Sequence, residues 1–299
     1  MCSRLRLPFG AVMIVLMVCW LSFLCSSIRG DQTPAPEAAS EEASASWSAT
    51  KFLERTRDVS SADYKRARSQ ALDQVGPEHV DEVPVLAGAV TETYRRRVPD
   101  LVRIIEKVGP QAIPKLIATV NESKDGKLQL GALKVLGLIQ VPSEQSAAVL
   151  DVFTEMLDDS NYALSGSAAD SLRKISPTSQ QSFAAAKDAA SSPYAHVRRN
   201  AVSILRMSQA NKAAPCLDAL LRDDSTAVCI DACVALGEFG ADAQDFAPSL
   251  VALLSSEQRS VREVAEQALR RVSPDEAQRI LGDPYDPVEE RRHAVGALM

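Results

Sequence analysis

The chain has 299 residues, of which 46% are hydrophobic, so it is long enough to bury a substantial core. Aromatic residues make up only 5% of the chain, a composition that argues against a β-sandwich and favours closely packed helices. The formal net charge is -6, and an acidic protein repels phosphate backbones, so we expect no nucleic acid among its partners.

Residues 1–30 are typical of a targeting segment. Arg4 and Arg6 precede an uncharged stretch from Leu7 to Ile28. Such a stretch is either a cleaved signal peptide or a retained anchor, since about 20 apolar residues span a bilayer. Both alternatives export the remainder, which is then secreted or anchored in the periplasmic, extracytoplasmic space. Membrane contact is expected only through residues 7–28, and only if they are not cleaved.

Residues 31–60 are expected to link this segment to the body of the chain. Residues 31–48 consist mainly of Pro, Ala, Ser and Glu. They have almost nothing to bury, so we expect a flexible tether. A short helix around Trp47–Arg57 is expected to follow, with Phe52 and Leu53 available to cover the first repeat.

Residues 61–299 repeat one pattern at intervals of 31 to 36 residues. A large aliphatic residue recurs once in each repeat. In the last five repeats an alanine lies four residues before it and a further aliphatic residue lies eight residues before it. These offsets fall on one face of a helix, and alanine allows neighbouring helices to approach closely. The recurring residues are Leu72, Ile105, Leu136, Leu172, Leu205, Leu236 and Leu269, and the alanines are Ala132, Ala168, Ala201, Ala232 and Ala265.

Most of these helices end at a Gly or Pro breaker such as Gly109-Pro110, and a second apolar helix then follows in most units. The fold class expected is therefore all-α. We predict a right-handed α-solenoid of about seven two-helix repeats over residues 61–299. Residues 288–298 would form a C-terminal half-repeat that caps the last hydrophobic edge.

A unit of about 33 residues with two helices and a Gly-Pro type turn resembles the HEAT repeat family. It is most similar to the short bacterial HEAT-like repeats of bilin lyases. The resemblance is carried by residues 197–201 (VRRNA), 228–240 and 261–269, whereas the units at 61–93 and 94–123 lack the alanine. It implies a protein that binds other proteins along a surface formed by the second helices.

No motif in the sequence specifies catalysis, a cofactor or a metal site. The histidines His79, His196 and His293 are far apart, and no phosphate-binding glycine-rich loop or Gly-x-Ser-x-Gly elbow occurs. The paired acids Asp158-Asp159 and Asp223-Asp224 lie in turns between repeats, where helix capping explains them. We therefore expect no enzyme activity.

Three cysteines, Cys216, Cys229 and Cys233, belong to the repeat region. We expect them to be small packing residues. A disulfide from Cys216 to one of the other two stays open, and a closed zinc site would need a fourth ligand. The run Arg95–Arg97 is expected to be a solvated helix start rather than an anion-binding patch.

The combined interpretation is a non-catalytic protein–protein interaction scaffold of the cell envelope, built on HEAT-like repeats. Its partner is expected to be one or more other proteins. The alternative is an accessory subunit or enzyme of the bilin-lyase type, which handles a covalently attached cofactor and predicts a reactive thiol or a ligand-sized pocket between repeats. Candidate partner-binding residues on the second helices are Lys115, Thr119, Asp218, Arg222 and Ser249.

Overall fold

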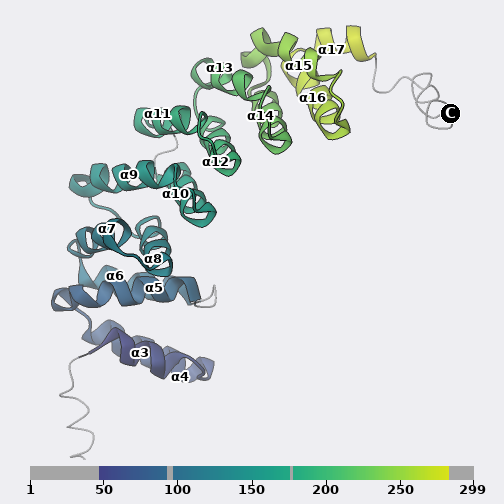
Figure 1. Ribbon diagram of the computed structural model, residues 1–299. Helices are drawn as coiled ribbons and strands as arrows, with labels where there is room; N and C mark the ends of the chain where they lie inside the picture. Colours follow the sequence, from purple (N-terminus) through teal and green to yellow (C-terminus); the bar gives the residue numbers. More distant parts are fainter. Residues whose placement is uncertain (1–46, 93–96, 176–177, 283–299) are drawn as a thin grey trace, which may run out of the picture. The chain divides into compact units, whose positions relative to one another are not determined.

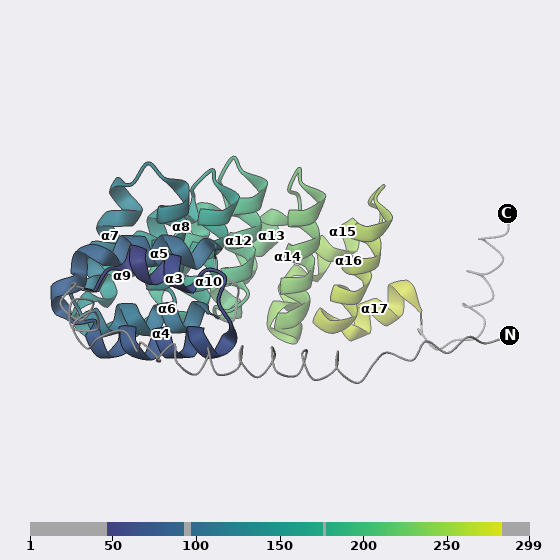
Figure 2. The same ribbon diagram turned by 90° about the horizontal axis from the view of Figure 1, so that it is seen from below.

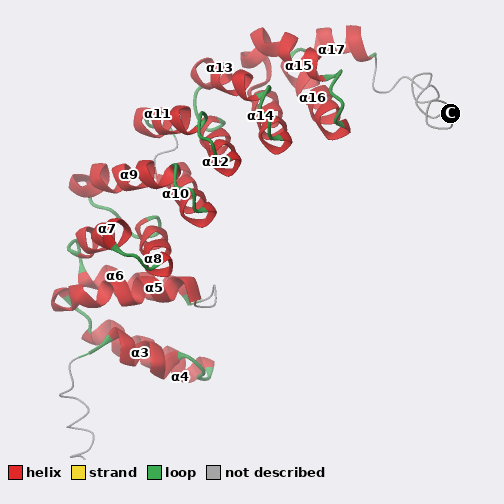
Figure 3. Ribbon diagram, in the orientation of Figure 1, coloured by secondary structure: helices red, strands yellow, loops and turns green. Residues whose placement is uncertain are grey.

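The computed structural model describes residues 47–92, 97–175 and 178–282. Within these ranges every regular element is a helix (Figure 3), which confirms the all-α fold class. None of the described helices is both long and apolar enough to cross a bilayer. The expected targeting segment, 1–30, and the expected half-repeat, 288–298, lie outside the described residues.

All the described helices belong to one compact unit, which begins at Ser48. One short helix precedes seven helix pairs in the described part of this unit (Figure 1). The helices are α3 (Ala49–Thr56), α4 (Ser61–Gln74), α5 (Val83–Glu92), α6 (Val98–Val108), α7 (Ala112–Glu122), α8 (Gly126–Leu136), α9 (Ser143–Leu157), α10 (Tyr162–Ile175), α11 (Gln180–Ala189), α12 (Ala195–Leu205), α13 (Ala210–Leu220), α14 (Thr226–Phe239), α15 (Ala247–Leu253), α16 (Arg259–Val272) and α17 (Pro274–Leu281). The 3-10 segments Pro77–Glu82 and Gly240–Phe246 lead into α5 and α15.

The pairs stack through their first helices. From α8 onwards, α8, α10, α12, α14 and α16 each pack on the next, and Figure 2 shows α12, α14 and α16 side by side. Each of these helices also packs on the second helix of the preceding pair, as α12 does on α11. This is the two-helix solenoid expected from the repeat, in which each unit buries its apolar face against its neighbours.

The core follows the predicted stripe. All five stripe alanines, from Ala132 to Ala265, have no exposed surface, and neither do the recurring aliphatic residues from Ile105 to Leu269. Leu72 is an exception, because it is only half-buried while Ala71 beside it is 1% exposed. Tyr64, eight residues before Leu72, and Val75, three residues after it, are buried, so α4 otherwise keeps the predicted register; this helix packs on α3 and α6.

The first two pairs also depart from the expected stacking. Unlike the later first helices, α8 does not stack on the first helix of the preceding pair, α6, but packs chiefly on α5. The reason is the size of the facing residues. A Cβ atom on Gly131 of α8 would lie 2.0 Å from the carbonyl oxygen of Ala87 in α5, so the two backbones touch. In α6 the position of the stripe alanine is occupied by Leu101, which prevents such an approach.

Candidate interaction surface

The five residues predicted to contact a partner lie in two separate places. Lys115 and Thr119 are on α7. The Lys115 ammonium lies 2.8 Å from the Asp81 carboxylate, and it is partly exposed. Thr119 is only 9% exposed, and its hydroxyl donates to the carbonyl oxygen of Lys115 at 2.7 Å. Thr119 therefore offers little surface to a partner.

The other three predicted residues come together at α13 and α15. The Arg222 guanidinium lies 3.7 Å from the Asp218 carboxylate one turn earlier. It also lies 3.5 Å from the hydroxyl of Ser249 on α15. The Arg222 side chain is 70% exposed and Asp218 is 22% exposed, so this cluster presents an accessible guanidinium beside a carboxylate on the second-helix layer.

Beside this cluster, a groove of about 410 Å³ runs between α11 and α13. Its lining combines apolar side chains with two ammonium groups. The sequence did not predict this groove, because α11 is a polar helix whose one large apolar side chain is that of Phe183. The groove is lined by Phe183, Lys187, Ala190, Ser191, Lys212, Pro215, Cys216, Ala219 and Leu220.

The three cysteines are unpaired, and two of them are packing residues, as expected. Cys229 is buried, and its thiol lies 3.1 Å from the carbonyl oxygen of Leu221. The hydrogen bond with Cys229, together with burial, raises the pKa of the Cys233 thiol. Cys216 differs, because it is partly exposed and lies in the groove.

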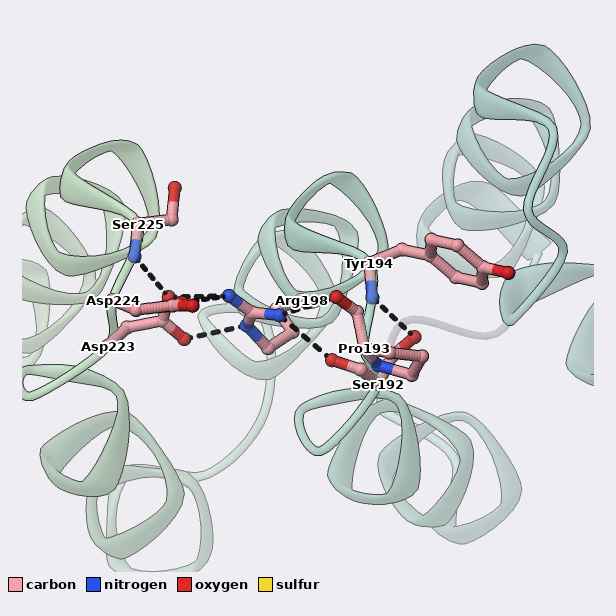
Figure 4. Close-up of polar contacts among 7 residues, drawn as sticks. All are labelled: Ser192, Pro193, Tyr194, Arg198, Asp223, Asp224 and Ser225. Atoms are coloured by element: carbon pink, nitrogen blue, oxygen red, sulfur yellow. Dashed lines mark hydrogen bonds and ion pairs between the residues drawn. The ribbon is translucent and has the colours of Figure 1, made fainter.

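A buried ion pair joins two loops between repeats (Figure 4). Arg198 of α12 donates from Nε and Nη2 to the two carboxylate oxygens of Asp223, both at 2.7 Å. Nη2 also lies 2.5 Å from an oxygen of Asp224. Nη1 donates to the carbonyl oxygens of Ser192 and Pro193 at 2.9 and 3.2 Å. This network is structural, since every donor aims at the protein itself.

Asp223 is held as a carboxylate by these contacts. Burial alone would raise its pKa, but the hydrogen bonds from Arg198 and from the backbone N–H of Ser225 lower it below the ordinary value of 3.8. Asp223 does not cap α14 as predicted, because the N-cap residue is Ser225 and Asp223 accepts from the backbone N–H of that residue at 2.8 Å, a bond within the turn. The pairing with Arg198 was not predicted, because the two residues belong to different repeats.

The position of Arg198 in its repeat has an equivalent in other first helices. In α8, α14 and α16 the equivalent side chain contacts a carbonyl oxygen near the end of the second helix before it, whereas Ser165 of α10 donates to the carbonyl oxygen of Tyr162 in its own helix. Gln129 donates to Val120 at 3.0 Å, and Arg262 donates to Ser256 at 2.7 Å. Cys229 occupies the same place in α14. In these three helices, polar groups at this position therefore satisfy carbonyl groups that the preceding helix leaves without a partner.

The run Arg95–Arg97 was expected to be solvated, and for Arg97 this expectation is wrong. Arg95 and Arg96 lie outside the described residues, but the Arg97 guanidinium lies 4.2 Å from the centre of the Tyr64 ring. It also donates to the carbonyl oxygen of Thr56 at 2.6 Å. Burial, with the nearby carboxylate of Asp100, raises the pKa of Tyr64 to about 12. Arg97 thus ties α3, α4 and α6 together.

The described residues include no group of three His, Cys, Asp or Glu side chains arranged to hold a metal ion. The described second helices carry the groove and the Arg222 cluster. The Arg222 cluster lies at α13 and α15. Pro215 lies within α13, and Pro248 lies in the first turn of α15.

Residues 183–270 match the family model of HEAT repeats. No curated protein matches the chain. Among solved structures, YibA of Escherichia coli is 19% identical with a TM-score of 0.48, and the match covers 71% of this chain and 76% of that one. A designed armadillo repeat protein in complex with the peptide (KR)4 is 16% identical with a TM-score of 0.42, and covers 64% and 99%.

Proposed function

Residues 183–270 are HEAT repeats, and on this premise we propose that the chain is a non-catalytic scaffold of the cell envelope that binds another protein through its second helices. The first helices bury their apolar faces where they stack on one another, so the second-helix layer is the surface that remains for recognition. The uncharged stretch from Leu7 to Ile28, behind two arginines, supports export.

The groove between α11 and α13 is the observation that carries this proposal. Its lining includes the apolar side chains of Phe183 and Leu220, and it also includes Lys187 of α11 and Lys212 of α13. Apolar burial would supply affinity, and the two ammonium groups would select a partner segment that carries carboxylates. The Arg222 cluster would extend the contact towards α15.

Pull-down of envelope proteins by the full-length chain tests the proposal. Lys187→Glu with Lys212→Glu reverses both charges at the groove. We expect this double variant to recover at least about tenfold less of the partner, since like charges facing one another cost more than 1 kcal/mol.

A matched variant provides the control. Lys134→Glu with Lys174→Glu makes the same charge change at exposed positions of α8 and α10, which are first helices. This variant is expected to recover the partner as the unmodified chain does. Equal loss from both double variants, or from neither, would remove the groove from the proposal.

A second function, that of an accessory subunit or enzyme of the bilin-lyase type, is favoured by one observation. Cys216 is partly exposed and lies in a groove of about 410 Å³ between repeats, as a thiol that carries a covalent cofactor would. Mass spectrometry of the chain purified from its native cells distinguishes the two functions. A cofactor-sized mass on Cys216 would favour the second, and an unmodified thiol would count against it.

A further inference from the structure

Two tyrosines with large exposed surfaces lie on either side of one histidine, in the loops between repeats. Tyr162 is 69% exposed at the start of α10, and Tyr194 is 43% exposed just before α12. The His196 ring centre lies 5.7 Å from that of Tyr162 and 5.6 Å from that of Tyr194. We call these three residues the aromatic patch.

The aromatic patch is held in place by contacts that leave both tyrosine side chains partly exposed. His196 Nε2 lies 3.4 Å from the carbonyl oxygen of Asp159, which fixes the imidazole between the rings. The Ser192 hydroxyl, two residues before Tyr194, donates to the carboxylate of Asp158 at 2.6 Å. The loops before α10 and α12 are thereby joined, so the rings are presented as one preformed surface.

Two carboxylates lie in the loop next to the aromatic patch, and one positive charge, that of Arg199, lies near it. Asp158 and Asp159 lie in the loop that leads to Tyr162, and neither carboxylate forms an ion pair with any other described residue. The positive charge of Arg199, which acts on Tyr162, is already matched by Asp231 at 2.7 Å. The exposed tyrosine rings and the two carboxylates therefore all attract a cation.

We propose that the aromatic patch binds an arginine side chain in an extended segment of a partner protein. A guanidinium can lie flat against a tyrosine ring while its N–H groups donate to a carboxylate, and a lysine ammonium lacks this planar fit. Exposed tyrosines in such positions commonly supply much of the energy of an interface. The aromatic patch shares no residue with the groove, so it is a second recognition surface.

Fluorescence anisotropy with the full-length chain tests this proposal. The probe is a labelled heptapeptide, Gly-Arg-Gly-Arg-Gly-Arg-Gly, and its comparison peptides carry glutamate or lysine in place of arginine. We expect the arginine peptide to bind, the lysine peptide to bind more weakly and the glutamate peptide not to bind. Tyr162→Ala with Tyr194→Ala is expected to weaken arginine-peptide binding about tenfold, the effect of losing a partly desolvated cation–π contact.

Two further variants keep the test decisive if the alanine variant is less stable. Tyr162→Phe with Tyr194→Phe retains both rings and is expected to bind as the unmodified chain does. Asp158→Asn with Asp159→Asn is expected to weaken binding. Its matched control, Asp242→Asn with Asp245→Asn, removes two exposed charges from the 3-10 segment before α15 and is expected to have no effect.

Three results would overturn the proposal. The first is equal binding of the glutamate and arginine peptides. The second is full affinity in the folded alanine variant. The third is equal loss from the two asparagine variants, which would mean that overall charge, and not the aromatic patch, attracts the peptide.

Discussion

Arg198 shows how a single side chain can connect neighbouring repeats. Its guanidinium is 11% exposed and faces a carboxylate of Asp223 that is 6% exposed. Two charges removed from water in this way are stable only when their hydrogen bonds are complete. Arg198 meets this condition by bonding to Ser192 and Pro193 as well. The loops before α12 and α14 are therefore held at a fixed spacing.

Removing this guanidinium is expected to be costly. Arg198→Leu leaves the buried Asp223 carboxylate without its cation and with only the backbone N–H of Ser225 as a donor, and we expect a loss of about 3–5 kcal/mol in the free energy of unfolding. Arg262→Leu is the matched variant, because Arg262 bonds to the same kind of carbonyl groups, those of Ser256 and Glu257. It forms no ion pair with a described residue, so we expect a smaller loss of about 1–2 kcal/mol. Urea unfolding of both variants measures the difference, and equal losses would mean that the Asp223 pair contributes nothing.

The lowered pKa of Asp223 makes part of the stability depend on pH. Its carboxylate is favoured in the folded state, so its contribution is present above the ordinary pKa of 3.8 and is lost as the pH falls through the lower folded value. We expect the unmodified chain to lose more stability than Asp223→Asn between pH 7 and about pH 3. Urea unfolding at both pH values tests this, and identical losses in the two proteins would contradict it.

For single residues, the sequence predicted the local role of a side chain better than its hydrogen-bond partner in another repeat. The place of Asp223 in a turn between repeats was predicted, and so was the packing role of Cys229, which follows from the residue type. The partners of Arg198 and Arg97 could not be predicted in the same way. Both arginines bond across repeats, and the sequence contains no signal that links positions 25 or 41 residues apart.

Among the helices, the contact between α5 and α8 depends on glycine. Gly131→Ala would place a Cβ atom 2.0 Å from the carbonyl oxygen of Ala87, so the helices would have to separate. We expect a loss of about 1–3 kcal/mol, the usual cost of overpacking. Gly166→Ala in α10 is the matched variant, because no atom lies within 4 Å of its added Cβ.

Both substitutions bring the same gain in helix propensity, so their difference isolates the contact. Gly166→Ala is expected to raise stability by up to about 1 kcal/mol. Thermal melting of the two variants gives opposite shifts if α5 and α8 touch as described. A rise in melting temperature for both would show that the two helices have room between them.

The same contact explains where sequence-based prediction of the fold succeeded and failed. From α8 onwards, an alanine at a fixed place in each first helix predicts which helices stack, and the burial of Ala201, Ala232 and Ala265 confirms it. In the first two pairs that alanine is missing. The small residues lie instead on α5, outside the predicted stripe, and only the packed helices reveal that α5 takes the place of α6 next to α8.

For the whole molecule, ion pairs and hydrogen bonds recur at the spacing of one repeat. Arg199 pairs with Asp231 and Arg206 with Glu238, in each case 32 residues apart. Lys115 reaches Asp81 over 34 residues. Most of these pairs are exposed and contribute little energy individually. They join each repeat to the next one, so stability is expected to be distributed along the stack as a sum of neighbouring interfaces.

The surface available for binding follows from this arrangement, although the sequence located it only in part. Asp218, Arg222 and Ser249 were predicted as contacts from their register on second helices, and they do lie together. The groove next to them could not be predicted, because its width depends on how far apart α11 and α13 lie. The role of Asp218, Arg222 and Ser249 in binding stays a prediction.

Site-specific photocrosslinking in the native cell tests the central claim most directly. One reactive residue replaces Ala219, which is exposed on α13 at the groove, and another replaces Lys174, which is exposed on the first helix α10. The scaffold account predicts that the probe at position 219 captures a discrete protein and that the probe at position 174 does not. Capture from position 174 alone, or equally from both, would contradict it.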